Sequence, residues 1–237
     1  MPSLEPKKLC ALVGFYMDKD AGERLLNNLE KYRLRSYWID SRVTNFPRLS
    51  NDPNDNSNDG LRELIIKAKY ATLIDTPSEP EPAGYWTSKF FQEMGNDYDF
   101  ILNLGCDEYI SGDLDLLMEN LIKMKINRPA KIRIPIIEHN PSNNHNIPHI
   151  TERIIAMPKH VYIKNIHWCY YHNFNGKEEI LYYSPLALGI TINHDDTIRP
   201  EIRNKIMDIY QRRKTKQEHN DFHAEISKVN NTQTIKL

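Results

Sequence analysis

Residues 99–112, DFILNLGCDEYISG, contain a short apolar run that ends at two neighbouring carboxylates. Residues 100–104 are mostly apolar between polar flanks, which is typical of a strand buried on both faces of a parallel sheet. The run stops at Gly105, and Asp107 and Glu108 follow almost at once. Open α/β sheets bind ligands at the carboxyl ends of their strands, so the pair is a candidate binding site. The alternative is a polar turn before a helix, whose first turn favours acids.

The composition limits the kinds of partner. The chain has 237 residues, which suits one α/β domain with a tail and is enough for a sizeable core. Lys and Arg number 31 and Asp and Glu number 32, so the formal net charge is -1 and no nucleic-acid partner is expected. Three widely spaced cysteines, Cys10, Cys106 and Cys169, form no disulfide framework or CxxC motif, which favours a reducing compartment.

Targeting signals are not evident in the sequence. The N-terminal stretch MPSLEPKKLCALVGFY has an apolar run too short for a signal core, and Glu5 precedes it. No stretch approaches ~18 apolar residues, so we expect no transmembrane segment. These features predict a cytoplasmic protein, with peripheral attachment at the inner membrane face as the variant of that prediction.

The first half of the chain alternates strand-like and helical patterns. Ala21, Leu25, Leu29 and Tyr32 form one apolar face of a helix. Such alternation predicts a parallel sheet with helices on both faces. The expected strands are 9–16, 36–40, 71–75 and 100–104, the expected helices are 18–32, 61–69 and 85–94 with Asp59 as an N-cap, and the expected loops are 45–60 and 76–84.

The second half reads differently, with short β-like runs after one helix at about 114–124. We expect strands at 131–137, 161–166, 180–183 and 188–193, with a loop at 138–149. The aromatic run at 168–174 favours an edge strand or hairpin over a sugar-stacking surface. A last helix is expected at 199–214. We therefore predict one catalytic domain at 7–214, with a nucleotide-binding half at 7–112, an acceptor half at 113–214 and a polar tail at 215–237.

This order of motifs resembles the GT-A glycosyltransferases of the family 2 type over about residues 9–210. In that family the first strand and the acid after the second strand hold the nucleotide, and an acidic cluster follows the fourth strand. A basic residue lies sixteen positions before the cluster, and two spaced histidines come later. The matching positions here are Asp40, Gly105-Cys106-Asp107-Glu108, Lys89 (105 minus 89), His167 and His194.

The resemblance implies a GT-A (nucleotide-diphospho-sugar transferase) fold, which is a Rossmann-like parallel and mixed sheet flanked by helices. It also implies a metal-dependent, hexosyltransferase-type enzyme that moves a sugar from a UDP-linked donor with inversion. The acceptor could be a glycan, a lipid-linked molecule or a protein, and the oligomeric state is left open. Mn²⁺ or Mg²⁺ would bridge the donor phosphates and neutralise the leaving group.

The resemblance and the chemistry of the residues together give a candidate site. Asp107 is the expected direct metal ligand and His194 the second, although a turn histidine is the alternative for His194. An imidazole beside oxygen ligands suits Mn²⁺ better than Mg²⁺. The expected nucleotide- or donor-binding residues are Tyr16, Asp40, Asp75, Lys89, Cys106 and Glu108.

An inverting reaction needs a base near the acceptor hydroxyl, and Asp195 and Glu138 are the candidates. Glu108 beside a metal would have a lowered pKa, which suits a ligand better than a base. Two positions depart from the family pattern, because Gly105 replaces the first acid and Trp168 follows His167 where an acid is common. The alternative function is therefore a catalytically silent GT-A-like module that binds a nucleotide or sugar.

Overall fold

The computed structural model describes residues 8–15, 19–40, 59–74, 85–140, 145–164 and 169–195. The chain divides into two units, Met1–Arg199 and Pro200–Leu237, and all described residues belong to the first. The expected helix at 199–214, the tail and the loop at 76–84 lie outside the described residues. The domain boundaries of the sequence analysis therefore stay a prediction.

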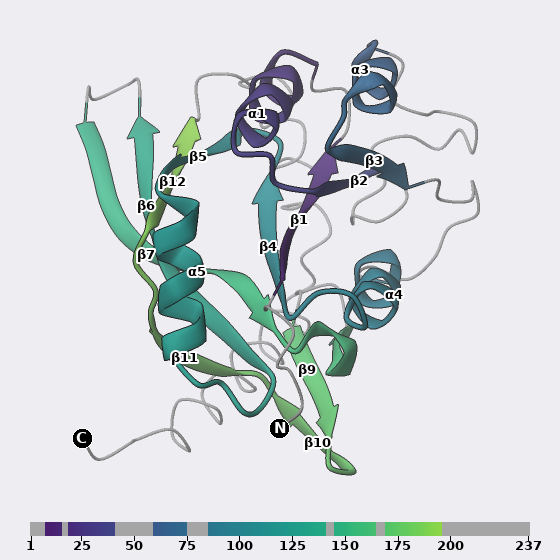
Figure 1. The fold of residues 1–237 in the computed structure, drawn as a ribbon, viewed down its shortest axis with the longest axis vertical. Coiled ribbons are helices and arrows are strands. Elements are labelled where there is room, and N and C mark those ends of the chain that lie inside the picture. Colours follow the sequence, from purple (N-terminus) through teal and green to yellow (C-terminus); the bar gives the residue numbers. More distant parts are fainter. Residues whose placement is uncertain are drawn as a thin grey trace, which may run out of the picture. The chain divides into compact units, whose positions relative to one another are not determined.

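Four parallel strands form one half of the main sheet (Figure 1). The helices between them follow in chain order, so the predicted alternation is confirmed. In this first half, the bounds of the described strands and helices lie within two residues of those expected. In sheet order the strands are β3 (Ala71–Ile74), β2 (Ser36–Asp40), β1 (Leu9–Phe15) and β4 (Phe100–Gly105), and the helices are α1 (Lys19–Lys31), α3 (Leu61–Lys67) and α4 (Tyr85–Met94).

Mixed strands continue the sheet beyond β4. The order is β3-β2-β1-β4-β7-β6-β12-β5, with β11 paired to β6. Strand β7 is antiparallel to both β4 and β6, so β6 and its parallel neighbour β12 run in the same direction as β4. This arrangement confirms the predicted fold class of a Rossmann-like parallel and mixed sheet flanked by helices. The added elements are β5 (Glu108–Gly112), α5 (Leu114–Lys123), β6 (Ala130–Asn140), β7 (His145–Ala156), β11 (Tyr182–Leu186) and β12 (Ile190–Asp195).

The predicted aromatic hairpin is confirmed in a second, three-stranded sheet. Its order is β10 (Lys177–Ile180), β9 (Cys169–Phe174) and β8 (Val161–Lys164), and the short helix η1 (Pro158–His160) precedes β8. Asn175 and Gly176 connect β9 to β10 with φ values of 55° and 74°. Asn-Gly favours this left-handed pair of conformations, whose twist matches that of the two strands.

The loop expected at 138–149 is wrong. Strand β6 continues through Glu138 to Asn140, and β7 begins at His145. The composition was misleading because this end of the hairpin is exposed. Pro148, His149 and Ile150 are all exposed, so backbone pairing rather than an apolar face holds them in the ribbon. The short strand β5 was also missed, because it directly follows the turn at Cys106 and Asp107 and ends after five residues at Gly112.

One helix start differs from its prediction in detail. Gly60, with φ of 95°, is the N-cap of α3, rather than Asp59. Asp59 still serves the turn, because its Oδ1 accepts a hydrogen bond from the Leu61 amide at 3.2 Å. Its Oδ2 accepts another from the Lys19 amide at 2.7 Å, at the start of α1. One carboxylate therefore stabilises the first turns of two helices.

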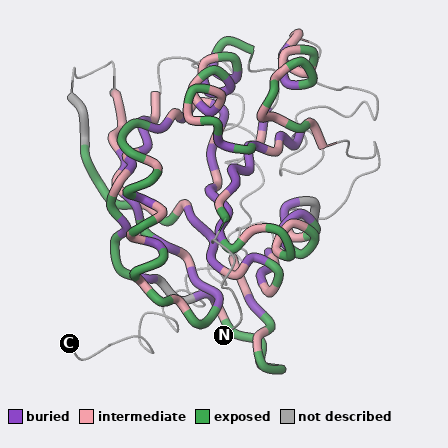
Figure 2. Tube along the Cα trace, in the orientation of Figure 1, coloured by how far each residue is buried: buried purple, intermediate pink, exposed green. Residues whose placement is uncertain are grey.

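The core lies on both faces of the parallel strands. Leu25 of α1, Ile65 of α3 and Leu117 of α5 are fully buried in one cluster, whereas Phe91 of α4 is buried against Ile101 in another. Figure 2 shows that the buried residues gather along β1 and β4. Fixed strands of this kind hold their carboxyl ends in place. Within the described part of the chain, no helix is both long and apolar enough to span a membrane.

Candidate active site

Acidic residues and a histidine gather at the carboxyl edge of the main sheet. Asp107 follows β4 by two residues, Glu138 lies near the end of β6, and His194 and Asp195 end β12. These strands run in one direction, so their ends meet at the same edge. Asp40 ends β2 at this edge as well. The expected position of Asp107 after a buried strand is confirmed, and the structure places the other residues at the same edge of the sheet.

Asp107 and His194 contact each other across this edge. The His194 Nε2 lies 3.5 Å from the Asp107 Oδ2, and the two side chains are 22% and 20% exposed. A backbone hydrogen bond holds the turn and the strand together, because the Asp195 amide donates to the Asp107 carbonyl oxygen at 3.2 Å. A carboxylate and an imidazole are therefore presented together from two distant segments, partly open to solvent.

Glu138 lies on the other side of His194. Its Oε1 is 3.9 Å from the His194 Nδ1 and 3.6 Å from the His149 Nε2. The side chain of Glu138 is 40% exposed, so it is the more accessible of the two base candidates. The two distances exceed a hydrogen bond, which leaves an ion-pair type of attraction whenever either histidine is protonated.

The other strand-end acids are held by arginines. Arg62 of α3 lies 3.2 Å from the Asp40 Oδ2, and the Asp40 side chain is only 1% exposed. Arg24 of α1 lies 2.7 Å from the Asp195 Oδ2, and its second Nη donates to the Asp107 carbonyl oxygen at 3.3 Å. The Arg24 guanidinium also lies over the Tyr109 ring, 4.8 Å from its centroid. Arg62 and Arg24 therefore compensate the charges of Asp40 and Asp195. The contact of Arg24 with Asp107 is to the backbone carbonyl.

Glu108 is a buried structural carboxylate. Arg153 of β7 forms an ion pair and hydrogen bond with its Oε1, and the Gly105 amide donates to its Oε2 at 2.6 Å. Burial raises the pKa of Glu108, and this effect outweighs the lowering by Arg153 and the Gly105 amide. The side chain is 1% exposed, so burial opposes the lowered pKa that was expected of Glu108 beside a metal, and that expectation stays a prediction. Glu108 closes the turn between β4 and β5.

Sequence reasoning missed Arg24, Arg62 and Arg153. In the sequence, Arg24 and Arg62 have the pattern of solvent-exposed residues on amphipathic helices. Their spacing does not indicate a partner that is distant in the chain. Arg153 offered a weak signal, since this basic residue lies directly before three apolar ones, IIA at 154–156. A charge in such a place needs a partner when the strand is buried.

Cys106 and Lys89 are placed less favourably for donor binding. The Cys106 side chain is 1% exposed and faces α1, because a Cβ at Gly22 would come within 3.0 Å of its Sγ. Burial raises the pKa of its thiol well above the ordinary value. Lys89 lies on the exposed face of α4 with its Nζ 3.9 Å from the Glu93 Oε1. Tyr16, Asp75, His167 and Trp168 lie outside the described residues.

Gly105 leaves room for the Asp107 carboxylate. A Cβ at Gly105 would lie 2.7 Å from the Asp107 Oδ1, which is closer than van der Waals contact allows. Any side chain at Gly105 would therefore displace the carboxylate. The departure from the family pattern at Gly105 thus has a local steric consequence in this chain.

Asp107 and His194 form a pair of metal-type ligands rather than a complete set. In the part of the chain that the structure describes, no group of three His, Cys, Asp or Glu residues is placed to hold a metal ion. Glu138 faces the far nitrogen of His194, so it does not converge on Asp107. Asp107 and His194 remain as a pair. Mg²⁺ and related ions are commonly held by one or two protein ligands together with substrate phosphates, so the pair fits an ion that arrives with a diphosphate.

No family model and no curated protein sequence matches the chain. Among solved structures, S. aureus TarS 1-349 in complex with UDP-GlcNAc is 15% identical over 60% of this chain and 37% of that chain, with a TM-score of 0.39. A structure of S. aureus TarS is 16% identical over 56% of this chain and 22% of that chain, with a TM-score of 0.38. A second structure of S. aureus TarS 1-349 is 15% identical over 60% of this chain and 38% of that chain, with a TM-score of 0.37. The chain thus spans 22–38% of these TarS chains, and such similarity transfers no residue role.

Proposed function

We propose that the protein is a glycosyltransferase that takes a sugar from a nucleotide-sugar donor, whose diphosphate binds with a divalent cation at Asp107 and His194. The observation that carries the proposal is the 3.5 Å approach of the His194 Nε2 to the Asp107 Oδ2 at the carboxyl edge of the sheet. This edge is where open α/β sheets bind ligands.

The charges around the edge support Asp107 over its neighbours as the ligand. Asp40, Glu108 and Asp195 each have an arginine within ion-pair distance of their carboxylate. A carboxylate neutralised in this way has less to offer a cation. The Asp107 carboxylate lies beside the His194 imidazole, which is itself a metal ligand when neutral. Asp107 and His194 together therefore offer two metal-type ligands at this edge.

A bound divalent ion would neutralise the charge that develops on the diphosphate leaving group. The ligand types favour Mn²⁺ over Mg²⁺, because one of the two is an imidazole nitrogen. Asp107 would supply the negative charge, and His194 would fix the position of the ion relative to the end of β12. Gly105 would keep the carboxylate in place by leaving the space beside its Oδ1 open.

Glu138 is our proposed general base, ahead of Asp195. The Asp195 Oδ2 is 2.7 Å from Arg24, so its charge is compensated and its orientation is fixed. Glu138 is twice as exposed, at 40% against 20%, and lies on the far side of His194 from Asp107. An acceptor hydroxyl that approaches this exposed edge would meet Glu138 first. Asp195 would then hold Arg24, and through it the turn that carries Asp107.

The proposal is tested by measuring turnover and binding with the same protein. Purified protein is incubated with Mn²⁺ and a panel of nucleotide sugars that begins with UDP-GlcNAc, the compound in the TarS complex. Release of UDP, or of another nucleoside diphosphate, that requires Mn²⁺ and is lost in Asp107→Asn supports the enzyme. Saturable binding of a nucleotide sugar without release, with several acceptors present, would identify a catalytically silent binding module instead. Asp113→Asn, at the N-cap of α5 away from the pair, is the matched control.

A further inference from the structure

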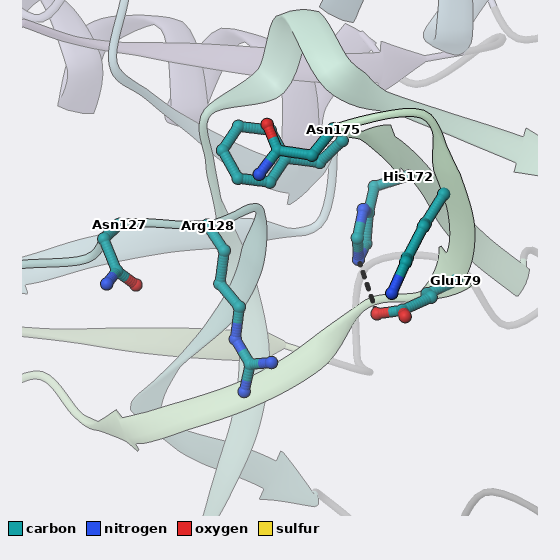
Figure 3. Close-up of a pocket in the computed structure, with 7 residues that line it drawn as sticks. Asn127, Arg128, His172, Asn175 and Glu179 are labelled. Atoms are coloured by element: carbon teal, nitrogen blue, oxygen red, sulfur yellow. Dashed lines mark ion pairs between the residues drawn. The ribbon is translucent and has the colours of Figure 1, made fainter.

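A cavity of about 380 Å³ lies away from the carboxylates of the candidate active site. It is formed between the connection from α5 to β6 and the β9–β10 hairpin (Figure 3). Asn127 and Arg128 come from the connection, and the other lining residues come from the hairpin. Cavities of this size are typical of small-molecule sites.

The cavity is separated from the candidate active site by the length of one strand. Arg128 lies two residues before β6 begins at Ala130, whereas Glu138 lies near the opposite end of the same strand. Ten residues of extended chain span roughly 33 Å at about 3.3 Å per residue. The cavity therefore belongs to the amino end of β6, and a molecule in it would not reach Asp107 or His194.

Cationic groups predominate around the rim of the cavity. Arg128 and Lys177 are exposed and carry permanent positive charges, and Glu179 is the one acid among the described residues that line the cavity. The amides of Asn127 and Asn175 add hydrogen-bond donors and acceptors. The surroundings thus favour a small anion over a neutral or cationic ligand.

His172 is a buried polar side chain that lines the same cavity. The residue is 4% exposed, and its Nδ1 is buried without a hydrogen-bond partner among the described residues. Its Nε2 lies 3.9 Å from the Glu179 Oε2, which is too far for a hydrogen bond. Figure 3 shows the His172 ring facing the Glu179 carboxylate. A buried imidazole without a close partner is costly unless a ligand or water satisfies it.

The charge on His172 depends on the groups that face it. Burial lowers the pKa of His172, Glu179 on β10 raises it, and Arg128 and His160 of η1 lower it further. Val161 is opposite His172 on β8 and has no charge. The net effect lowers the pKa of His172, which favours the neutral ring at pH 7. An anion beside it would favour the protonated form, so binding of the anion and of a proton would be coupled.

We propose that this cavity binds a phosphate group, with Arg128 and Lys177 as its permanent cationic contacts and His172 as a donor that is strengthened by protonation. A guanidinium presents paired N–H donors that match the oxygens of a phosphate. The group could be inorganic phosphate or a phosphate monoester on a larger molecule. In the second case Phe174 and the two amides would contact the remainder of the molecule.

Titration followed by amide NMR tests the proposal with defined probes. Sodium sulfate is used first, because it stays a dianion across pH 6 to 8, and sodium chloride at equal ionic strength is the control. We expect saturable shifts of the amides at 127–128 and 172–179 with sulfate and none with chloride. Affinity should rise about three- to tenfold from pH 8 to pH 6, as His172 becomes protonated. Inorganic phosphate and glucose 6-phosphate, compared at pH 8, then distinguish a free anion from a monoester by which binds more tightly.

Variants with opposite expected effects exclude a general loss of structure. Arg128→Gln and Lys177→Gln should each weaken sulfate binding, by about tenfold for Arg128. Glu179→Gln should strengthen it about threefold at pH 8, because the acid competes with the anion. Lys123→Gln should leave it unchanged, since Lys123 is an exposed helix lysine beside Glu119. His172→Gln should remove the pH dependence.

Two results would overturn the proposal. The first is a set of sulfate shifts that chloride reproduces or that do not saturate. The second is an affinity that Arg128→Gln and Lys123→Gln lower equally. Neither outcome depends on turnover at Asp107, so this test is independent of the proposed glycosyltransferase activity.

Discussion

The Nε2 of His194 lies 3.5 Å from the Oδ2 of Asp107, and a backbone hydrogen bond between Asp195 and Asp107 joins the same two segments. The imidazole comes from the end of β12, and the carboxylate comes from the turn after β4. Their approach is thus fixed by the sheet rather than by a mobile loop. Site geometry that rests on rigid strands is suited to holding a cation and a diphosphate together.

Replacement of Asp107 by Asn should remove metal-dependent binding and turnover. The change keeps the volume but removes the charge, so Mn²⁺ affinity in the presence of UDP should fall about tenfold or more. Calorimetric titration of Mn²⁺ measures the effect, and the melting temperature checks that the fold is kept. Unchanged Mn²⁺ affinity in a folded Asp107→Asn protein would exclude Asp107 as the ligand.

Substitutions of His194 and Glu138 should separate metal binding from base catalysis. His194→Gln should raise the Mn²⁺ concentration needed for half-maximal rate more than it raises the KM for the nucleotide sugar. Glu138→Gln should lower kcat about 10²- to 10⁴-fold, the usual contribution of a general base, with little change in donor KM. Steady-state kinetics at several Mn²⁺ concentrations measures both. If Asp195→Asn shows the Glu138 pattern and Glu138→Gln does not, the base has been assigned to the wrong residue.

A methyl group at Gly105 should disturb the site without unfolding the protein. The Cβ of Gly105→Ala would lie 2.7 Å from the Asp107 Oδ1, and the carboxylate, as the end of a side chain, can move aside. Mn²⁺ affinity should fall while the urea midpoint changes little. Gly176→Ala is not a suitable control, because its φ of 74° would add backbone strain. Wild-type Mn²⁺ affinity in Gly105→Ala would contradict this account of the glycine.

The buried pair of Glu108 and Arg153 should matter more for stability than for chemistry. Arg153→Met would leave Glu108 uncompensated at 1% exposure, and loss of one partner of a buried ion pair costs about 3–5 kcal/mol. The double variant Arg153→Met, Glu108→Gln should recover much of the loss, because the neutral amide no longer needs a cation. Urea unfolding of the single and double variants measures the coupling. Additive effects would show that the two side chains do not interact.

His172 should make the protein less stable in acid. Its pKa in the folded protein is lowered, mainly by burial, so the unfolded chain binds more protons between that value and 6.5. Stability is therefore complete above pH 6.5 and falls as the pH drops below it, by at most about 1.4 kcal/mol per pH unit from this group. Urea unfolding at pH 5.5 and 7.5, in buffers without phosphate or sulfate, measures the slope. His172→Phe should flatten it, and an unchanged slope would contradict this role.

Much of the fold followed from apolar patterning, because the buried elements leave a clear signal. Strand Ser36–Asp40 and helix Tyr85–Met94 have the bounds expected from the sequence. The extension of β6 and β7 around Glu138 and His149 was not expected from the sequence, since backbone pairing holds it without an apolar face. Asp107, expected from its strand-end position, and His194, expected from the resemblance, lie beside each other in the structure.

The charge partners in the site could not be predicted in the same way. Arg24, Arg62 and Arg153 reach Asp195, Asp40 and Glu108 from elements far away in the chain. Long side chains find such partners through tertiary packing, which has no local sequence period. The burial of Glu108, which raises its pKa, could not be predicted for the same reason, because it depends on strands that pair at long range.

The most direct test of the central claim is to locate Mn²⁺ by its paramagnetic broadening of amide NMR signals in the presence of UDP. We predict that the signals of residues 105–109 and 192–195 broaden first and saturably in the wild-type protein, and that Asp107→Asn abolishes this. Broadening centred elsewhere, or the same broadening in Asp107→Asn, would contradict a cation site at Asp107 and His194.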